Sequence, residues 1–200
     1  MKKFIALVTA FAALAALAIP VSASAYTSSW KMEGTPLAAN GTITLTGWAK
    51  FSGGTKCHVH AHITLTAGGG TGEASEFSPQ NLSECEITET LKTLGCTALT
   101  SSTPENLPWM LDDEGTYAKV SSGASGPIKL TNHYTGTGFC PGTVTLEERA
   151  GEELRATPDN VSAIHKLTLS GTIHTSLGTT STVTGELEPV NPADSGTYGL

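Results

Sequence analysis

The chain has 200 residues, of which 38% are hydrophobic and 14% are charged, and its formal net charge at pH 7 is −7. Nucleic acid and anionic membrane surfaces are poor partners for an acidic chain without a run of Lys or Arg. We therefore expect no nucleic-acid partner, and we interpret the acidic charge as a contribution to solubility.

The N-terminus has the pattern of a secretory signal peptide. Lys2 and Lys3 precede an apolar run over residues 4–19, and residues 23–25 are the small residues that a signal peptidase needs. The short basic start and the alanine-rich run are typical of bacteria. The run is shorter than the about 20 residues of a comfortable membrane span, although an N-terminal membrane anchor is the alternative. We expect a signal peptide over residues 1–25.

The mature part, residues 26–200, is long enough for one domain with its own core. Its apolar residues alternate with polar ones, and threonine recurs on the polar side, which is typical of a half-buried sheet. We predict an all-β fold: a single antiparallel β-sandwich or β-barrel domain of short strands, with little or no helix after the signal peptide. The expected location is secreted, extracellular or in the cell envelope, and the mature chain is not expected to span a membrane.

The first predicted hairpin joins residues 43–51 to residues 57–65. Both segments alternate strictly, so each has an apolar face and a polar face. With residues 52–56 as the turn, pairing Phe51 with Cys57 puts both apolar faces on one side. A slip by one residue would place these apolar side chains in water.

The polar face of residues 57–65 carries three histidines, His58, His60 and His62. Imidazoles on alternate residues of a strand can converge on one zinc or copper ion, and catalysis would require a third ligand and an open position for water. Such a third ligand could be a carboxylate or one of His133, His165 and His174. The alternative is that the three histidines are the solvent face of a strand.

Trp48 lies on the same predicted face, opposite His60 in the predicted register. An outward aromatic ring beside polar groups can bind a flat ligand such as a sugar. A surface aromatic can also be covered by a loop of the same domain. Trp48 is therefore a candidate ligand-binding residue.

All four cysteines lie in the mature part, which favours two disulfides in an exported chain and leaves three possible pairings. Cys85 and Cys96 are close in sequence, as for a bridge across a hairpin or loop. We therefore prefer Cys85–Cys96 and Cys57–Cys140. A zinc site is the alternative, but the chain has no C-x-x-C spacing.

The middle of the chain is less regular. Residues 68–72 form a predicted glycine-rich turn, and Trp109 is expected to be buried. Residues 112–115 form a predicted solvated turn, whose carboxylates could alternatively hold Ca²⁺. Residues 147–156 are helix-prone, or else a charged edge or loop. We predict further strands over residues 72–77, 83–87, 95–100, 117–120, 128–134 and 142–147.

A second hairpin is predicted near the C-terminus. Residues 167–173 and 183–187 carry apolar stripes joined across residues 176–180. Its Leu-Thr-Leu-Ser-Gly is similar to the Ile-Thr-Leu-Thr-Gly of residues 43–47. A decayed internal repeat would explain this similarity, and we favour the alternative that both hairpins follow the same turn and strand preferences.

Four short segments resemble a group of small secreted β-proteins from actinobacteria. They are Leu107-Pro108-Trp109, Phe139-Cys140-Pro141, Thr157-Pro158-Asp159-Asn160 and Gly196-Thr197-Tyr198-Gly199-Leu200. This resemblance implies export, disulfides and an all-β fold, and it implies no active site.

The leading functional hypothesis is a non-enzymatic exported domain that binds an unknown extracellular ligand or a component of the envelope. The sequence has no Gly-x-Ser-x-Gly nucleophile motif, and oxidised cysteines supply no thiolate. No cofactor is expected under this hypothesis. The alternative is a metal-binding protein or metal-dependent hydrolase that holds zinc or copper on His58, His60 and His62.

Overall fold

The computed structural model describes residues 31–32, 35–36, 42–65, 71–159 and 166–190. The predicted signal peptide, most of the predicted glycine-rich turn, His165 and the C-terminal segment of the resemblance lie outside these residues. The all-β prediction is confirmed, because strands dominate the described chain. None of the helices in the described residues has the length and apolarity needed to cross a membrane.

The strands belong to two antiparallel sheets. The small sheet pairs β1 (Lys31–Met32) with β2 (Thr35–Pro36). The strands of the large sheet are β3 (Thr42–Phe51), β4 (Thr55–Leu65), β5 (Thr71–Pro79), β6 (Glu86–Ile87), β7 (Cys96–Glu105), β8 (Trp109–Asp113), β9 (Ala118–Ser121), β10 (Lys129–Gly136), β11 (Thr143–Glu147), β12 (Leu154–Asp159), β13 (Lys166–Thr175) and β14 (Thr180–Pro189). Two short helices, η1 (Leu82–Glu84) and α1 (Glu89–Thr93), lie between β5 and β7.

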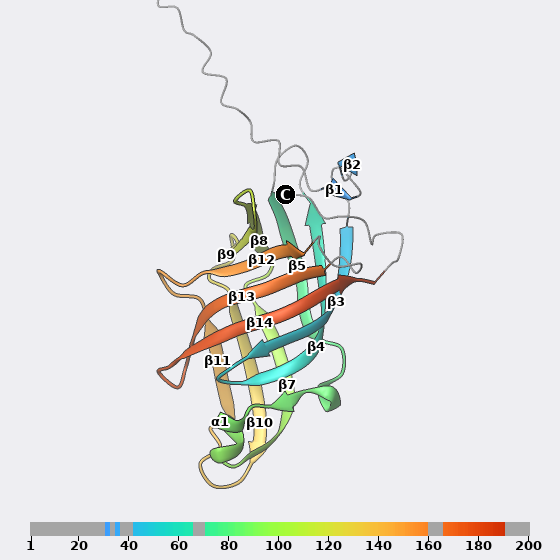
Figure 1. Ribbon diagram of the computed structural model, residues 1–200. Helices are drawn as coiled ribbons and strands as arrows, with labels where there is room; N and C mark the ends of the chain where they lie inside the picture. Colours follow the sequence, from blue (N-terminus) through green and yellow to red (C-terminus); the bar gives the residue numbers. More distant parts are fainter. Residues whose placement is uncertain (1–30, 33–34, 37–41, 66–70, 160–165, 191–200) are drawn as a thin grey trace, which may run out of the picture.

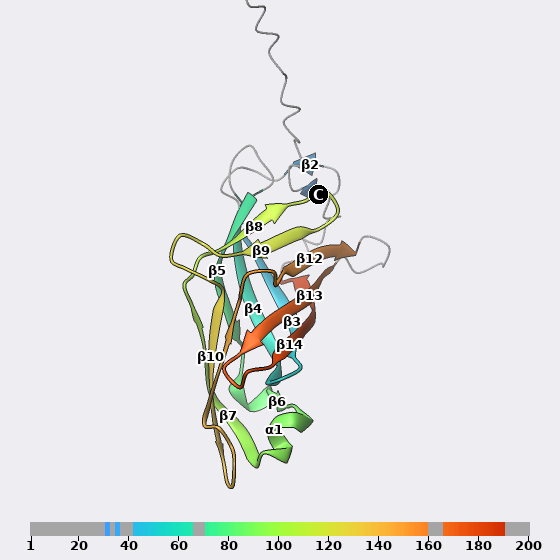
Figure 2. The ribbon, with the colours of Figure 1, turned by 90° about the vertical axis from the view of Figure 1, so that its left-hand side faces the viewer.

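Part of the large sheet closes into an antiparallel barrel of eight strands. The order around the ring is β12-β9-β8-β5-β4-β3-β14-β13, and pairing of β12 with β13 completes it. The first part of β13 pairs with β12, and its last two residues pair with β11. The sheet then continues outside the ring, because β11 pairs with β10 and β10 pairs with β7. In Figures 1 and 2, the wall that contains β3, β13 and β14 faces the wall that contains β7 and β10. We call the closed ring the ring end.

Two glycines allow neighbouring strands of the ring to approach closely. Gly47 has a φ of +157° and Gly171 a φ of +145°. A β-carbon at Gly47 would lie 2.0 Å from the carbonyl oxygen of Glu186, and one at Gly171 would lie 2.1 Å from that of Glu153. Both positions therefore require glycine, for conformational and for steric reasons.

The first hairpin forms with the predicted faces, but its register differs from the prediction by two residues. Ala49, not Phe51, pairs with Cys57, because the turn contains three residues and β4 begins at Thr55. The amide of Gly54 donates to the carbonyl of Phe51 at 2.9 Å and closes this turn. A shift of two residues keeps every side chain on its predicted face and changes only its neighbours.

The second predicted hairpin forms, and its register places Leu167 opposite Leu187 and Gly171 opposite Val183. Residues 147–156 contain no helix, since they end β11, form a turn and enter β12. This outcome is the charged loop that was the stated alternative. The sequence analysis did not predict β1, β2, η1, α1, β8 or β12, of which β8 carries the buried Trp109. Of the strand predicted over residues 83–87, only Glu86–Ile87 is a strand.

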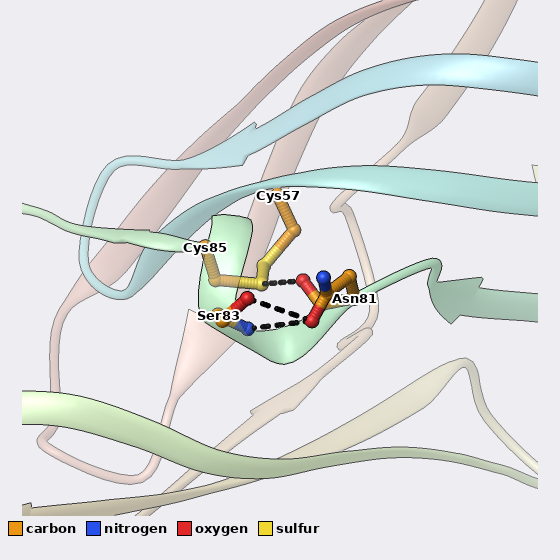
Figure 3. Close-up of a disulfide and its surroundings, with 4 residues drawn as sticks. All are labelled: Cys57, Asn81, Ser83 and Cys85. Atoms are coloured by element: carbon orange, nitrogen blue, oxygen red, sulfur yellow. Dashed lines mark hydrogen bonds between the residues drawn. A yellow bond between two sulfur atoms is a disulfide. The ribbon is translucent and has the colours of Figure 1, made fainter.

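The preferred disulfide pairing is wrong. The bonds are Cys57–Cys85 and Cys96–Cys140, with Cα–Cα distances of 4.3 and 4.9 Å. Pairing of β6 with the start of β4 carries Cys85 to Cys57, as Figure 3 shows. The segment between Cys85 and Cys96 contains α1 rather than a hairpin turn, and Cys96 enters β7 instead.

Both disulfides lie near the strands that are not part of the closed ring. We call this region, which consists of β6, α1, β7, β10 and β11, the disulfide end. Strand β6 pairs with β4 over only two residues, and β7 is the last strand of the path. The two bonds therefore fasten strands at the edges of the sheet. Disulfides also indicate an oxidising environment.

The buried polar side chains of the described structure surround the β3–β4 turn, where the ring meets the disulfide end. They are Thr55, Asn132, Thr175 and Ser181, together with the hydroxyl of Tyr134. The amide of Gly53 donates to the Ser181 hydroxyl at 3.0 Å, and a β-carbon at Gly54 would lie 3.3 Å from the Tyr134 hydroxyl.

Burial raises the pKa of Tyr134 to about 12, although Asn132 and Thr55 act in the opposite direction. The Asn132 amide and the Tyr134 hydroxyl make no well-aligned hydrogen bond in the described structure. Buried polar groups at this end of the core therefore lack good hydrogen-bond partners, whereas the interior of the ring is apolar and needs none.

Candidate functional site

The three histidines lie on the outward face of β4, as predicted. The residues between them, Val59 and Ala61, are buried, whereas His58, His60 and His62 are half-buried. Strict alternation in an extended strand accounts for this division.

The outer histidines are held by polar neighbours on β5 and at its end. Nδ1 of His58 lies 2.8 Å from Oε1 of Gln80, and the amide nitrogen of Gln80 donates to the Thr46 hydroxyl. Nδ1 of His62 lies 3.1 Å from Oε2 of Glu76. Both side chains of this pair are more than 40% exposed, so the pair is a solvated one.

The predicted third metal ligands have other neighbours. Nδ1 of His133 is 3.0 Å from the Thr143 hydroxyl, and Nδ1 of His174 is 4.0 Å from a Glu152 oxygen. Among residues 42–65, 71–159 and 166–190, no group of three or more His, Cys, Asp or Glu side chains is arranged to hold a metal ion. The metal site on His58, His60 and His62 therefore remains a hypothesis that only the sequence pattern supports.

Trp48 is exposed on the same face, with 38% of its surface accessible. The two-residue shift in register places it opposite His58, not His60, and the two rings meet edge to face with centroids 5.0 Å apart. The ammonium group of Lys56 lies 4.4 Å from the Trp48 ring centroid, within cation–π distance. Trp48, the predicted candidate ligand residue, is thus partly exposed, and His58 and Lys56 contact its ring.

The inside of the ring contains a second candidate site, which the sequence analysis did not identify. An apolar cavity of about 70 Å³ lies within the barrel. All eight ring strands contribute to its lining, and residues 128 and 130 at β10 join them. The apolar lining residues are Leu45, Phe51, Ala61, Ile63, Ala74, Phe77, Trp109, Leu111, Val120, Ile128, Leu130, Leu154, Ala156, Leu167, Leu169, Ile173, Val183 and Leu187.

Small side chains at inward positions explain why space remains. Ala61, Ala74 and Ala156 point inward from three different strands, where larger residues would fill an eight-stranded barrel. On one side of the cavity, Trp109 packs against Phe77 with ring centroids 5.6 Å apart. Protein interiors have few voids larger than a water molecule, so a cavity of this size is unusual.

Two polar residues, Arg155 and Ser170, also line the cavity, and they are cross-strand partners on β12 and β13. Arg155 is exposed, so the cavity approaches the surface here. Its guanidinium donates to both carboxylate oxygens of Glu153 and lies over the ring of Tyr117. The hydrogen bond from Arg155 is the main cause that lowers the pKa of Glu153, and the Tyr117 hydroxyl contributes.

Alternation predicted the inward residues of the two hairpins, and inward alanines could have suggested free space. The strand order decides which of them face one another, and local alternation does not contain that order. Comparison of the chain with protein-family models, curated proteins and solved structures finds no match.

Proposed function

We propose that the protein is an exported, non-enzymatic binding domain of the cell exterior or envelope, and that its barrel interior holds a small apolar ligand. The observation that supports this proposal is the apolar cavity inside a closed ring of eight strands. Barrels of this size are either filled by side chains or hold one small ligand.

The chemistry of the lining defines the class of ligand. A largely apolar pocket favours an apolar ligand because binding removes apolar surface from water. Arg155 and Ser170 add almost no polar surface to the lining, so the ligand should be apolar throughout. The cavity is smaller than the roughly 150 Å³ apolar cavity known to accept benzene, so the ligand must be small or slender.

Export is supported by the N-terminal pattern and by the two disulfides. A barrel fastened covalently at one end suits an oxidising exterior. Signal peptide, bacterial origin and secretion are parts of the proposal.

The test uses the mature domain with benzene and a series of n-alkanols as probes. We expect one or more of these probes to raise the thermal midpoint, because a ligand that binds only the folded state stabilises it. The same probe should change the emission of Trp109, which lines the cavity, and this change should vanish in Trp109→Phe.

Two cavity-filling variants, Ala61→Leu and Ala74→Leu, should lose the response to the probe. The matched control is Ala98→Leu, which makes the same change at an exposed position on β7 and should keep it. If no probe shifts the midpoint, or if the filled variants respond like the wild type, the proposal is wrong.

A further inference from the structure

A second hollow lies on the outside of the molecule, between the β3–β4 hairpin and α1, with a volume of about 440 Å³. We call it the lysine hollow. It is lined by Lys50, Ser52, Lys56, Glu86, Ile87, Thr88, Glu89, Thr90 and Lys92.

The hollow is held in place by covalent and hydrogen bonds. The Cys57–Cys85 disulfide lies directly beside the cross-strand pair Lys56 and Glu86. At the start of α1, both the amide and the hydroxyl of Thr88 donate to the carbonyl of Gly54, at 3.0 and 2.8 Å. These bonds join α1 and β6 to the hairpin, so the hollow is a fixed feature of the disulfide end.

The hollow gathers lysines in an acidic chain, although Glu86 and Glu89 reduce the formal charge of its lining to +1. Three of the chain's eleven Lys and Arg residues line the hollow, although the net charge of the chain is −7. Lys50 and Lys56 are direct cross-strand partners, an arrangement of like charges that is destabilising by itself. Lys92 is paired with Glu89 at 2.8 Å, and Glu86 is the second acidic residue. Glu86, the cross-strand partner of Lys56, offsets part of this repulsion, and an anionic group between Lys50 and Lys56 would offset more of it.

Trp48 lies beside the hollow. Lys56, which lines the hollow, also holds its ammonium 4.4 Å from the Trp48 ring centroid. A ligand seated against Lys50 and Lys56 would therefore reach a partly exposed aromatic ring. Ser52 and Thr90 add hydroxyl groups, and Glu86 and Glu89 add acceptors.

We propose that the lysine hollow and Trp48 bind a saccharide that carries a carboxylate. The sugar ring would lie against the exposed part of the Trp48 side chain, beside the Lys56 ammonium, the carboxylate would accept hydrogen bonds from Lys50 and Lys56, and sugar hydroxyls would use the remaining polar groups. Pockets that hold one small molecule measure roughly 300–1,000 Å³, which agrees with the size of the hollow. This site is separate from the barrel interior and does not depend on the proposed function.

The test measures binding of trigalacturonic acid to the mature domain by titration calorimetry, with maltotriose as the neutral counterpart. We expect binding of the acidic trisaccharide only, and we expect it to weaken as salt is added, because exposed charges are screened. Trp48→Ala and the double variant Lys50→Gln/Lys56→Gln should each weaken binding at least tenfold.

Lys119→Gln, on β9, is the matched control and should bind as the wild type does, with circular dichroism confirming that every variant is folded. Ala61→Leu should also bind normally, which separates this site from the barrel interior. The proposal is overturned if trigalacturonic acid does not bind, if maltotriose binds equally well, or if Lys119→Gln weakens binding as much as the double variant does.

Discussion

The ring end and the disulfide end of this molecule are stabilised in different ways. At the ring end, eight strands close on themselves, so every edge is paired and the interior is apolar. At the disulfide end the ladder stays open, both disulfides are present, and Asn132 and the Tyr134 hydroxyl are buried without well-aligned partners. The comparison indicates that covalent bonds fasten strands where backbone pairing ends.

The same division separates the two proposed sites. The cavity is enclosed by the ring, where apolar side chains from all eight strands meet. The lysine hollow lies on the outside, between the β3–β4 hairpin and the short elements β6 and α1, and the Cys57–Cys85 bond fastens these elements to β4. Each site can therefore be altered without the other.

The largest expected effect is at the ring end. Gly47→Ala should destabilise the protein by more than about 4 kcal/mol, because its β-carbon would lie 2.0 Å from the Glu186 carbonyl oxygen. Denaturant unfolding of the purified variant measures this loss. Gly115→Ala is the control: nothing lies within 4 Å of its β-carbon, so only its φ of +89° costs energy, about 1 kcal/mol. Equal losses in the two variants would contradict this explanation of the close approach.

At the disulfide end, removal of either bond should cost about 3–4 kcal/mol by the loop-entropy estimate. The bonds close loops with sequence separations of 28 and 44 residues, so the two losses should be similar. Urea unfolding of Cys57→Ala/Cys85→Ala and of Cys96→Ala/Cys140→Ala measures them.

Hydrogen exchange in the same two variants tests the comparison between the ends. We expect faster exchange in β7 and β10 of the Cys96→Ala/Cys140→Ala variant, and unchanged protection in β13 and β14. Loss of protection throughout the ring would show that the disulfides stabilise both ends alike.

The buried Tyr134 should make the disulfide end sensitive to alkali. An unfolded tyrosine ionises near pH 10, whereas burial raises the pKa of folded Tyr134 to about 12. The unfolded state therefore loses its proton first as the pH rises. The stabilising contribution is complete below pH 10 and is lost between pH 10 and about 12, by at most about 2.7 kcal/mol.

Unfolding free energies of the wild type and Tyr134→Phe, measured from pH 8 to pH 11.5, test this prediction. The wild type should lose stability above pH 10 relative to the variant. Parallel curves would mean that Tyr134 ionises equally in both states.

The smallest expected effect concerns metal. Zinc or copper should not raise the thermal midpoint of the wild type above that of His60→Ala, because in the described part of the chain no group of three or more His, Cys, Asp or Glu side chains is arranged to hold a metal ion. A rise that saturates at one equivalent of metal and disappears in His60→Ala would restore the hypothesis of a metal site on β4.

Much of the fold follows from alternation in the sequence. The two faces of β4, the second hairpin and the burial of Trp109 agree with the predictions. Sequence reasoning failed at α1 and at the disulfides, because the short spacing of Cys85 and Cys96 suggested a local bridge. The candidate site was predicted in part: Trp48 and the histidines are on one outer face, but the lysines of the hollow were not recognised.

The sequence by itself determined which side of each strand is apolar, because side-chain direction alternates with every residue regardless of the partner. Only the tertiary structure decided the register of the first hairpin, the closure of the ring, the disulfide partners and the place where Lys50, Lys56 and Lys92 meet. The hairpin register depends on the length of its turn, since two registers keep the same faces buried. The other features depend on contacts between segments far apart in the chain, which local alternation does not specify.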